Sequence, residues 1–380
     1  MSGDNVKAYI VNSSTHFPER FYPQQELAEV VCSFLDAHDL SFSRETVRSL
    51  FENVGIEGRH FSFSVDDFNH PQNVELTANQ AIQACVNAAE ANVRSVLDQA
   101  NLGPGDIDQI VSVTLTPAVP GIEARLMNRI AFRHDLVRVP LAGLGCMAGV
   151  AAINRAADYL ESRPENAALV ISCELSSALW QGSVQADLLN MIREVERKPD
   201  LHAEIVMAIV TAALFGDGSG ALLMVGRDHA LASGAAIKVL DTQSNWLPET
   251  EHIMGLDYVG FGMRNILRPE VKTHVGAGLR NVIEPMLQRN NLGVGDIGHW
   301  TLHPGGPKIM DVAESYFGLS KEKMRPSREA LKNVGNISSA TVLYMLNKAL
   351  REAKPPERTP GLLVAMGPGF SQEAALVEWC

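Results

Sequence analysis

The chain has 380 residues, of which 46% are hydrophobic, and its 44 Asp and Glu residues outnumber its 32 Lys and Arg residues to give a formal net charge of −12. This length suits two domains or one large duplicated domain with a packed core. The acidity argues against a nucleic-acid partner, and no apolar run reaches the length of a membrane span, so we expect a soluble, cytoplasmic protein without a membrane partner.

Predicted helices and strands alternate along the chain, as in an α/β protein. Residues 76–100 have the periodicity of a long helix, and residues 107–116 are apolar enough for a buried strand. Residues 137–143 lead into an apolar helix, and residues 167–175 return as a strand.

Cys146 lies at the start of that apolar helix, between Gly145 and a run of small residues. A helix N-terminus carries free N–H groups and roughly +0.5 of an elementary charge, which favours a thiolate over a thiol. Small residues at Gly145, Ala148 and Gly149 leave room for a bulky acyl group. The position predicts that Cys146 is a nucleophile.

The other cysteines carry no comparable signal. Cys32, Cys85, Cys173 and Cys380 show no Cys-x-x-Cys spacing with each other or with Cys146. This scatter argues against a zinc site and against a secreted disulfide framework, and it predicts reduced thiols and no bound metal. Cysteine is among the most buried residue types, so we interpret Cys85 and Cys173 as core residues.

The chain also contains an internal repeat. Asn-Leu-Gly-x-Gly-Asp-Ile begins at Asn101 and again at Asn291, an offset of 190 residues, each time before a predicted strand. The same offset places Cys146 on Asn336, which again precedes an apolar helix. Two matches at one offset predict two duplicated α/β halves whose buried helices meet near a pseudo-twofold axis.

A nucleophilic cysteine needs a charge partner and an oxyanion site, and the second half offers candidates for both. His303 follows the repeated strand, where loops of α/β proteins carry functional residues, and a rigid Pro-Gly-Gly-Pro comes next. Asn336 is equivalent to Cys146, so the repeat symmetry would bring it near the thiol. Taken alone, Asn336 would be interpreted as a helix cap.

Five motifs, in order and over nearly the whole chain, resemble those of type III polyketide synthases, the chalcone and stilbene synthase family, in its bacterial branch. They are Gly-Cys-Met-Ala-Gly at 145–149, Leu-Phe-Gly-Asp-Gly at 214–218, His-Pro-Gly-Gly-Pro at 303–307, Gly-Asn-Ile-Ser-Ser-Ala at 335–340 and Gly-Pro-Gly-Phe at 367–370. The segment 140–156 is also similar to phloroglucinol-forming members.

The resemblance implies a thiolase-like fold, with two duplicated α/β halves in a layered αβαβα arrangement, and a homodimer. The first half, residues 1–226, would carry the nucleophilic cysteine. The second half, residues 227–380, would carry the catalytic histidine and asparagine.

The same resemblance implies a catalytic triad of Cys146, His303 and Asn336. Cys146 would take an acyl group from a CoA starter, and the other two would hold the thioester oxygen of malonyl-CoA as it loses carbon dioxide. Condensation and cyclisation would give a pyrone, a resorcinol or a phloroglucinol-type product. CoA thioesters are substrates in this scheme, and no cofactor or metal is needed. His303 as an imidazolium would lower the pKa of the thiol further.

The resemblance also implies substrate contacts. Phe215 matches a gatekeeping aromatic residue, and Met263 occupies the position of a second one, with Phe261 as a competing candidate. Without the resemblance, Phe215 would be interpreted as a core residue. Further substrate-binding residues implied in this way are Thr114, Ser176, Gly306, Ser338 and Phe370.

The basic residues that meet the CoA phosphates in the family are poorly represented here. Arg48 and Arg59 are the candidates in the corresponding N-terminal region, and neither aligns with the family pattern. Lys308, directly after His-Pro-Gly-Gly-Pro, is the best remaining candidate, although it also suits an ordinary solvated lysine.

The largest departure from the family lies between Trp180 and Phe215, an interval roughly twice as long as usual. Leu188, Leu189, Ile192 and Val195 recur at helical spacing, which predicts an extra amphipathic helix. Such a helix would serve as a lid over the pocket or cover the dimer surface.

Three alternatives stay open from the sequence. One is a 3-oxoacyl-carrier-protein synthase III or another thiolase-fold condensing enzyme with the same three residue types. A second is a nucleotide-binding protein, because Gly143, Gly145 and Ala148 satisfy Gly-x-Gly-x-x-Ala and Glu174 ends the next strand. A third is a non-catalytic scaffold of the same fold.

Overall fold

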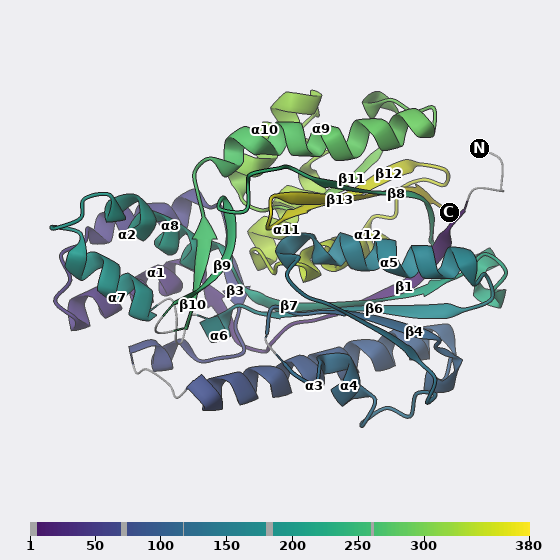
Figure 1. Ribbon diagram of the computed structural model, residues 1–380, viewed down its shortest axis with the longest axis horizontal. Helices are drawn as coiled ribbons and strands as arrows, with labels where there is room; N and C mark the ends of the chain where they lie inside the picture. Colours follow the sequence, from purple (N-terminus) through teal and green to yellow (C-terminus); the bar gives the residue numbers. More distant parts are fainter. Residues whose placement is uncertain (1–5, 70–73, 117, 180–184, 260–261) are drawn as a thin grey trace.

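The computed structural model describes residues 6–69, 74–116, 118–179, 185–259 and 262–380 (Figure 1). Within these ranges, nine strands form one mixed sheet in the order β11-β12-β13-β8-β1-β7-β6-β4-β5. The strands from the first half of the chain are β1 (Ala8–His16), β4 (Gln109–Val113), β5 (Val137–Leu141), β6 (Ala167–Leu175) and β7 (Asp217–Val225). Those from the second half are β8 (Ile237–Trp246), β11 (His299–Leu302), β12 (Pro360–Gly367) and β13 (Ser371–Trp379).

The two halves of the sheet repeat one pairing pattern. In the first, β1 and β7 are antiparallel, β7 and β6 are antiparallel, and β6 and β4 are parallel. In the second, β8, β13, β12 and β11 follow the same sequence of antiparallel, antiparallel and parallel pairs. A short antiparallel pairing of β1 with β8 joins the halves. The strand order therefore shows the internal repeat that the sequence predicted, while the boundary at residue 226 stays a prediction.

The turns that revealed the repeat have the same conformation. Asn101 and Asn291 both adopt the left-handed region, with φ of 53° and 55°. In each turn the N–H of the following glycine, Gly103 or Gly293, donates to the aspartate three residues later at 2.8 Å. Asparagine tolerates this conformation, which explains why both turns use it.

Helices form three layers around the two halves of the sheet, which gives the predicted αβαβα order (Figure 1). The outer layers are α9 (Val271–Arg289) with α10 (Pro307–Phe317), and α3 (Val74–Ala100) with α4 (Ile122–Leu126). The middle layer contains α5 (Ala148–Ser162), α11 (Arg325–Val334) and α12 (Ala340–Glu352). Apolar side chains of α5 and α12 share one core with strands of both halves.

The helices α5 and α12 approach each other closely where they begin. A Cβ atom at Gly149 would overlap the carbonyl oxygen of Ser339, so this position has no room for a side chain. Small residues on α5 thus allow the two helix N-termini to meet, as the repeat symmetry required.

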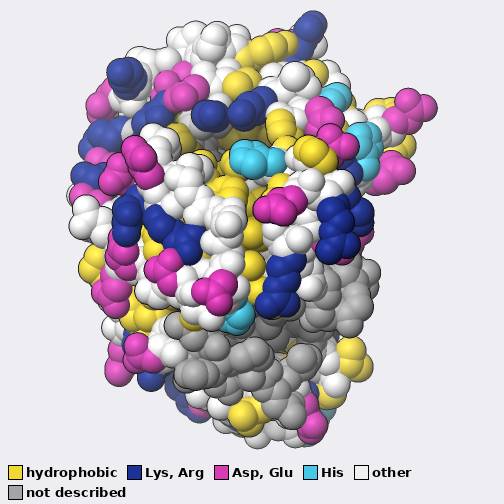
Figure 2. Space-filling model, turned by 90° about the vertical axis from the view of Figure 1, so that its left-hand side faces the viewer, with side chains coloured by type: hydrophobic (Ala, Val, Ile, Leu, Met, Phe, Trp, Pro, Cys, Tyr) yellow, Lys and Arg dark blue, Asp and Glu magenta, His cyan; other side chains and the backbone are white. Residues whose placement is uncertain are grey.

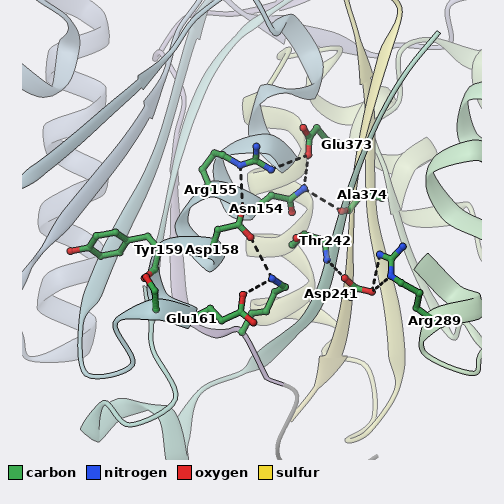
Figure 3. A network of polar contacts seen from close by, with 12 residues as sticks. Asn154, Arg155, Asp158, Tyr159, Glu161, Asp241, Thr242, Arg289, Glu373 and Ala374 are labelled. Carbon is green, nitrogen blue, oxygen red and sulfur yellow. Dashed lines mark hydrogen bonds and ion pairs between the residues drawn. The ribbon is translucent and has the colours of Figure 1, made fainter. Parts of the chain in front are cut away.

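Polar contacts also tie α5 to the second half of the sheet (Figure 3). The amide Nδ2 of Asn154 donates to Glu373 at 2.6 Å and to the Ala374 carbonyl at 3.2 Å, both on β13. The hydroxyl of Ser244 on β8 donates to the other oxygen of Glu373 at 2.7 Å. These bonds satisfy a buried carboxylate and link the halves.

The helix predicted over Leu188 to Val195 is present as α7 (Gln185–Glu194), and α8 (Leu201–Leu214) follows it. That this segment is extra relative to the family stays a prediction. They pack with α1 (Gln24–Ala37) and α2 (Arg44–Asn53) at one end of the molecule (Figure 1). Leu188 and Ile192 are buried in the core there, and Leu189 and Val195 pack against it. Trp180, where the insertion was predicted to begin, lies outside the described residues.

The remaining elements are short. They are β2 (Phe21–Pro23) paired with β3 (Gly58–His60), β9 (Met254–Val259) paired with β10 (Gly262–Leu267), and α6 (Ser177–Leu179). Across the part of the chain that the structure describes, no helix combines the length and apolarity that crossing a bilayer requires.

Candidate active site

Cys146 lies in a single helical turn (Gly145–Met147) that leads directly into α5. Gly145 has a φ of 53°, and a Cβ atom there would come within 2.7 Å of the Pro368 ring, so glycine is required on both grounds. The thiol sulfur accepts a hydrogen bond from the hydroxyl of Ser338 at 3.6 Å. A residue of the second half thus contacts the nucleophile candidate of the first.

Asn336 reaches the same thiol. Its side chain is hydrogen bonded to Cys146, which opposes the rise of the thiol pKa caused by burial. Its Oδ1 accepts from the backbone N–H of Ser338 at 2.8 Å, and Ser338 has a φ of 51°. The structure therefore brings Cys146, Asn336 and Ser338 together at the N-termini of α5 and α12.

His303 follows β11 and is 2% exposed. Its backbone N–H donates to Val364 on β12 at 2.8 Å. Strand β12 continues to Gly367, which lies against the Leu144 carbonyl and the Met147 side chain, so the end of β12 borders both His303 and the Cys146 turn. Neither ring nitrogen of His303 has a hydrogen-bond partner among the residues described. Buried histidines normally have one, which marks this ring as open to a ligand.

The pKa values differ from the sequence prediction in direction. Cys146 is partly buried beside the cavity, and desolvation raises the pKa of its thiol to about 11, despite the hydrogen bonds from Ser338 and Asn336. Burial likewise lowers the pKa of His303 to about 4. Burial thus shifts both pKa values opposite to the thiolate and imidazolium expected from the sequence, and it favours a neutral thiol and a neutral imidazole.

Glu174 is a site residue whose place the sequence did not predict. It is fully buried at the end of β6, where it accepts hydrogen bonds from the Leu115 N–H at 2.8 Å and from the hydroxyl of Ser339. Burial raises its pKa to about 7, and its charge contributes to the raised pKa of Cys146. The sequence signal was a lone carboxylate in an apolar strand, which we considered only as part of a nucleotide motif. These hydrogen bonds occupy Glu174 and do not support that alternative.

A cavity of about 440 Å³ opens beside Cys146 and is lined largely by apolar groups. Ser176 and Phe215 line it, as the resemblance implied, and so does Thr211 of α8. The β9-β10 hairpin and the turn at Pro368 contribute the opposite walls. Figure 2 shows the end of the molecule that carries these elements, where hydrophobic side chains gather in a central strip below a group of Lys and Arg side chains.

The other substrate-binding candidates occupy different places. Thr114 directly follows β4, and its hydroxyl lies 3.8 Å from the sulfur of Cys85. Phe370 is 1% exposed in the core, and its neighbours Pro368 and Gly369 line the cavity instead. Gly306 precedes α10 with a φ of 153°. Met263 lies on β10, but its side chain and all of Phe261 are outside the described residues.

The three basic residues considered as contacts of the CoA phosphates lie in different environments. Arg48 is exposed and forms an ion pair with Glu29 at 2.6 Å. Arg59 is fully buried, so it does not meet a phosphate at the surface. Lys308 is exposed in the first turn of α10. It contacts Lys272 in the first turn of α9, and burial together with repulsion from Lys308 lowers the pKa of Lys272.

Cys85 and Cys173 are buried core residues, which confirms that prediction. The described residues contain no cluster of three or more His, Cys, Asp or Glu side chains that could hold a metal ion.

Two family models match the sequence. One, described as chalcone and stilbene synthases, C-terminal domain, matches residues 238–379. The other, described as FAE1/Type III polyketide synthase-like protein, matches residues 5–192.

Curated relatives and solved structures agree with these matches. The chain is 32% identical to a 1,3,6,8-tetrahydroxynaphthalene synthase of Streptomyces peucetius, over 96% of this chain and 91% of that protein. It is 28% identical to a phloroglucinol synthase of Pseudomonas fluorescens, over 96% and 97% of the two chains. The crystal structure of the 1,3,6,8-tetrahydroxynaphthalene synthase of Streptomyces coelicolor superposes with a TM-score of 0.84 at 26% identity, covering 98% of this chain and 99% of that one. The chain therefore belongs to the chalcone and stilbene synthase family of type III polyketide synthases, which are malonyl-CoA-dependent acyltransferases with a thiolase-like fold.

Proposed function

We propose that Cys146 carries the growing acyl chain, that His303 and Asn336 activate malonyl-CoA, and that the product is released after cyclisation. The observation that supports this assignment best is the junction at the N-termini of α5 and α12. There a thiol faces an apolar cavity and an asparagine side chain contacts it. The buried His303, bonded to the strand β12 that ends at this junction, has both ring nitrogens open.

Loading begins from the neutral pair. The sulfur of Cys146 attacks the thioester carbon of the starter acyl-CoA, and its proton passes to His303, which is an unprotonated base at neutral pH because its pKa is low. The tetrahedral intermediate expels the CoA thiolate, which takes up that proton. The acyl group is then bound to Cys146 as a thioester, and His303 is neutral again.

Extension uses the same residues in a second role. An N–H of His303 and the amide of Asn336 donate to the thioester oxygen of malonyl-CoA, so the electrons of the breaking carboxylate bond move onto that oxygen as carbon dioxide leaves. The resulting enolate carbon attacks the acyl thioester on Cys146. A carbon–carbon bond forms, the sulfur of Cys146 leaves, and a 3-oxoacyl-CoA is ready for another cycle.

The apolar lining suits a starter with a hydrocarbon chain and a folded polyketide. Two relatives are named for polyhydroxylated aromatic products, which supports a resorcinol or phloroglucinol-type product over a linear acid. A pyrone is the third possible product.

We further propose that Lys308 and Lys272 bind the phosphates of CoA. Two ammonium groups in contact repel each other, and an anion between them would remove that repulsion. Lys308 lies five residues after His303, and Lys272 lies five residues after Leu267 of the cavity wall. Short segments thus connect one lysine to His303 and the other to the cavity wall at Leu267. A cytoplasmic homodimer that uses no metal or cofactor completes the proposal.

Incubation with malonyl-CoA and a panel of acyl-CoAs, with mass spectrometry of the products, tests the function. A cyclised polyketide whose mass matches a starter plus whole acetate units supports it. Condensation only with malonyl groups on a carrier protein would favour the carrier-protein-dependent alternative.

A further inference from the structure

Arg59 follows Gly58 in β3, and its side chain is fully buried. Its Nη1 donates to two backbone carbonyls at the C-terminus of α8, those of Ala212 and of the next residue after the helix, Phe215, each at 2.6 Å. Its Nε donates to the side chain of Gln24 at 3.2 Å, and Gln24 in turn donates to the Ala213 carbonyl at 2.8 Å. This pair of side chains therefore holds three of the four carbonyls from Ala212 to Phe215.

The remaining carbonyl, that of Leu214, accepts from the backbone N–H of Asn336 at 2.9 Å. The chain then returns the contact, because the N–H of Gly216 donates to the Asn336 carbonyl at 3.0 Å. The segment that Arg59 holds is thus hydrogen bonded on both sides to the residue whose amide contacts Cys146.

The aliphatic part of Arg59 packs beneath the same junction. A Cβ atom at Gly335 would come within 2.7 Å of its Cγ, and one at Gly216 would come within 3.2 Å of its Cβ. The side chain therefore supports both glycines that flank the bridge. A residue larger than glycine at position 335 would displace Arg59 or Asn336, and the φ of 71° adds strain to any such replacement.

The guanidinium keeps its charge in this apolar setting. Phe61 and Phe51 lie 5.3 and 5.9 Å from its carbon, measured to the ring centres. Burial lowers the pKa of Arg59 to about 9, and the charge of Asp217 opposes that shift. Arginine is consequently protonated at neutral pH and donates to all the acceptors named above.

We propose that Arg59 is a positioning residue for decarboxylation, which aims the Asn336 amide by holding the segment of Phe215 to which Asn336 is bonded. The inference rests on the proposed role of Asn336 as an oxyanion donor. It assigns Arg59 a function other than binding CoA, and it connects helix α8 to the reaction centre.

The test compares two steps in the same full-length variants. Arg59→Met removes the N–H donors while it keeps a long apolar side chain. Arg59→Lys keeps the positive charge and a single donor nitrogen. Malonyl-CoA decarboxylation should fall roughly 10²-fold in Arg59→Met, the usual effect of a small misplacement of a reacting group, and Arg59→Lys should recover part of that loss. Acylation of Cys146, followed by intact-protein mass spectrometry, should fall much less. The matched control is Arg94→Met, which removes an exposed arginine paired with Glu90, and both steps should keep the wild-type rate.

A double variant separates positioning from general damage. In Arg59→Met/Asn336→Ala the loss of decarboxylation should equal that of Asn336→Ala alone, because Arg59 acts through Asn336. Additive losses, or equal losses in loading and decarboxylation, would overturn the inference. Should Arg59→Met not fold, Gln24→Met provides the same comparison, since it removes the bond to Ala213 and the acceptor of Arg59. If Asn336→Ala alone decarboxylates at the wild-type rate, the proposed role of Asn336 fails. If Arg59→Met decarboxylates malonyl-CoA at the wild-type rate but Asn336→Ala does not, the proposed role of Arg59 fails and that of Asn336 stands.

Discussion

Phe215 and Asn336 form an isolated parallel β-bridge, although they are more than a hundred residues apart in the chain. Phe215 lines the cavity, and the side chain of Asn336 contacts the Cys146 thiol. The wall of the substrate cavity and the proposed oxyanion donor are thus parts of one backbone unit. A change that moves one of them is expected to move the other.

The first prediction concerns the nucleophile. Cys146→Ala should abolish both covalent acylation and product formation, because every cycle passes through the thioester on that sulfur. Mass spectrometry of the intact protein after incubation with an acyl-CoA measures the adduct. Cys85→Ala is the control. It should keep acylation and product formation, and it should lower only the stability of the fold. An acyl adduct on folded Cys146→Ala would place the nucleophile elsewhere.

The second prediction separates loading from decarboxylation. Asn336→Ala removes an amide donor but keeps the thiol, so decarboxylation of malonyl-CoA should fall by roughly 10² to 10³, the usual effect of losing one oxyanion donor. Loading of Cys146 should persist in the same protein. His303→Ala should slow both steps, because it serves as base in one and as donor in the other. Wild-type decarboxylation by Asn336→Ala would reduce Asn336 to a structural residue.

The third prediction follows from the neutral thiol. Because the pKa of Cys146 is raised to about 11, only a small fraction of the thiol is ionised at pH 7. As long as the pH is below this pKa, the thiolate fraction increases about tenfold for each unit by which the pH rises. The alkylation rate of Cys146 by iodoacetamide should therefore rise continuously from pH 7 to pH 9. Peptide mass spectrometry isolates this residue from the other four cysteines. A plateau above pH 7 would instead indicate a preformed thiolate and imidazolium.

The fourth prediction addresses the proposed phosphate site. Lys308→Ala and Lys272→Ala should each raise the KM for malonyl-CoA roughly fivefold with little change in kcat, the size expected for one exposed charge interaction of about 1 kcal/mol. The effect should shrink at high salt. A truncated malonyl thioester without the nucleotide is the control, and its KM should be the same in all variants. An equal loss with that substrate would rule out a phosphate contact.

The fifth prediction concerns stability. The pKa of Glu174 is raised to about 7 in the folded protein, so the folded state binds its proton more tightly than the unfolded state does. Its contribution to stability is complete below the pKa of the unfolded chain and is lost as pH rises through about 7, by up to about 3 kcal/mol. Glu174→Gln should remove this decline in urea unfolding measured from pH 5 to pH 8. An unchanged slope would place the pKa of Glu174 near its ordinary value.

Much of the fold could be predicted because the sequence repeats itself. The turns at Asn101 and Asn291 revealed two related halves, and the same offset placed Asn336 opposite Cys146 before any coordinate was known. His303 was identified by its place after a strand. These signals are local, since each depends on a few neighbouring residues and their spacing.

The residues that were missed depend on distant contacts. The sequence suggested Arg59 only as a possible CoA contact, and only the fold shows that α8 and the segment before Asn336 pack against it. The effect of burial on the Cys146 pKa could not be predicted for a related reason, because helix position is visible in the sequence whereas the depth of burial is not. The gatekeeping role of Met263, and the role of the extra helix as a lid or as part of the dimer surface, stay predictions.

Gly149 and Ser339 are in close contact in the folded protein, but the ribosome makes the two helices that carry them at very different times. Helix α5 is synthesised almost two hundred residues before α12, so the part of its apolar surface that faces α12 stays uncovered until then, although β4 and β6 already cover another part. A ribosome-bound chain that ends before residue 340 therefore exposes that apolar surface, a state that favours chaperone binding. A chain that ends before residue 336 carries Cys146 without its contacts to Asn336 and Ser338.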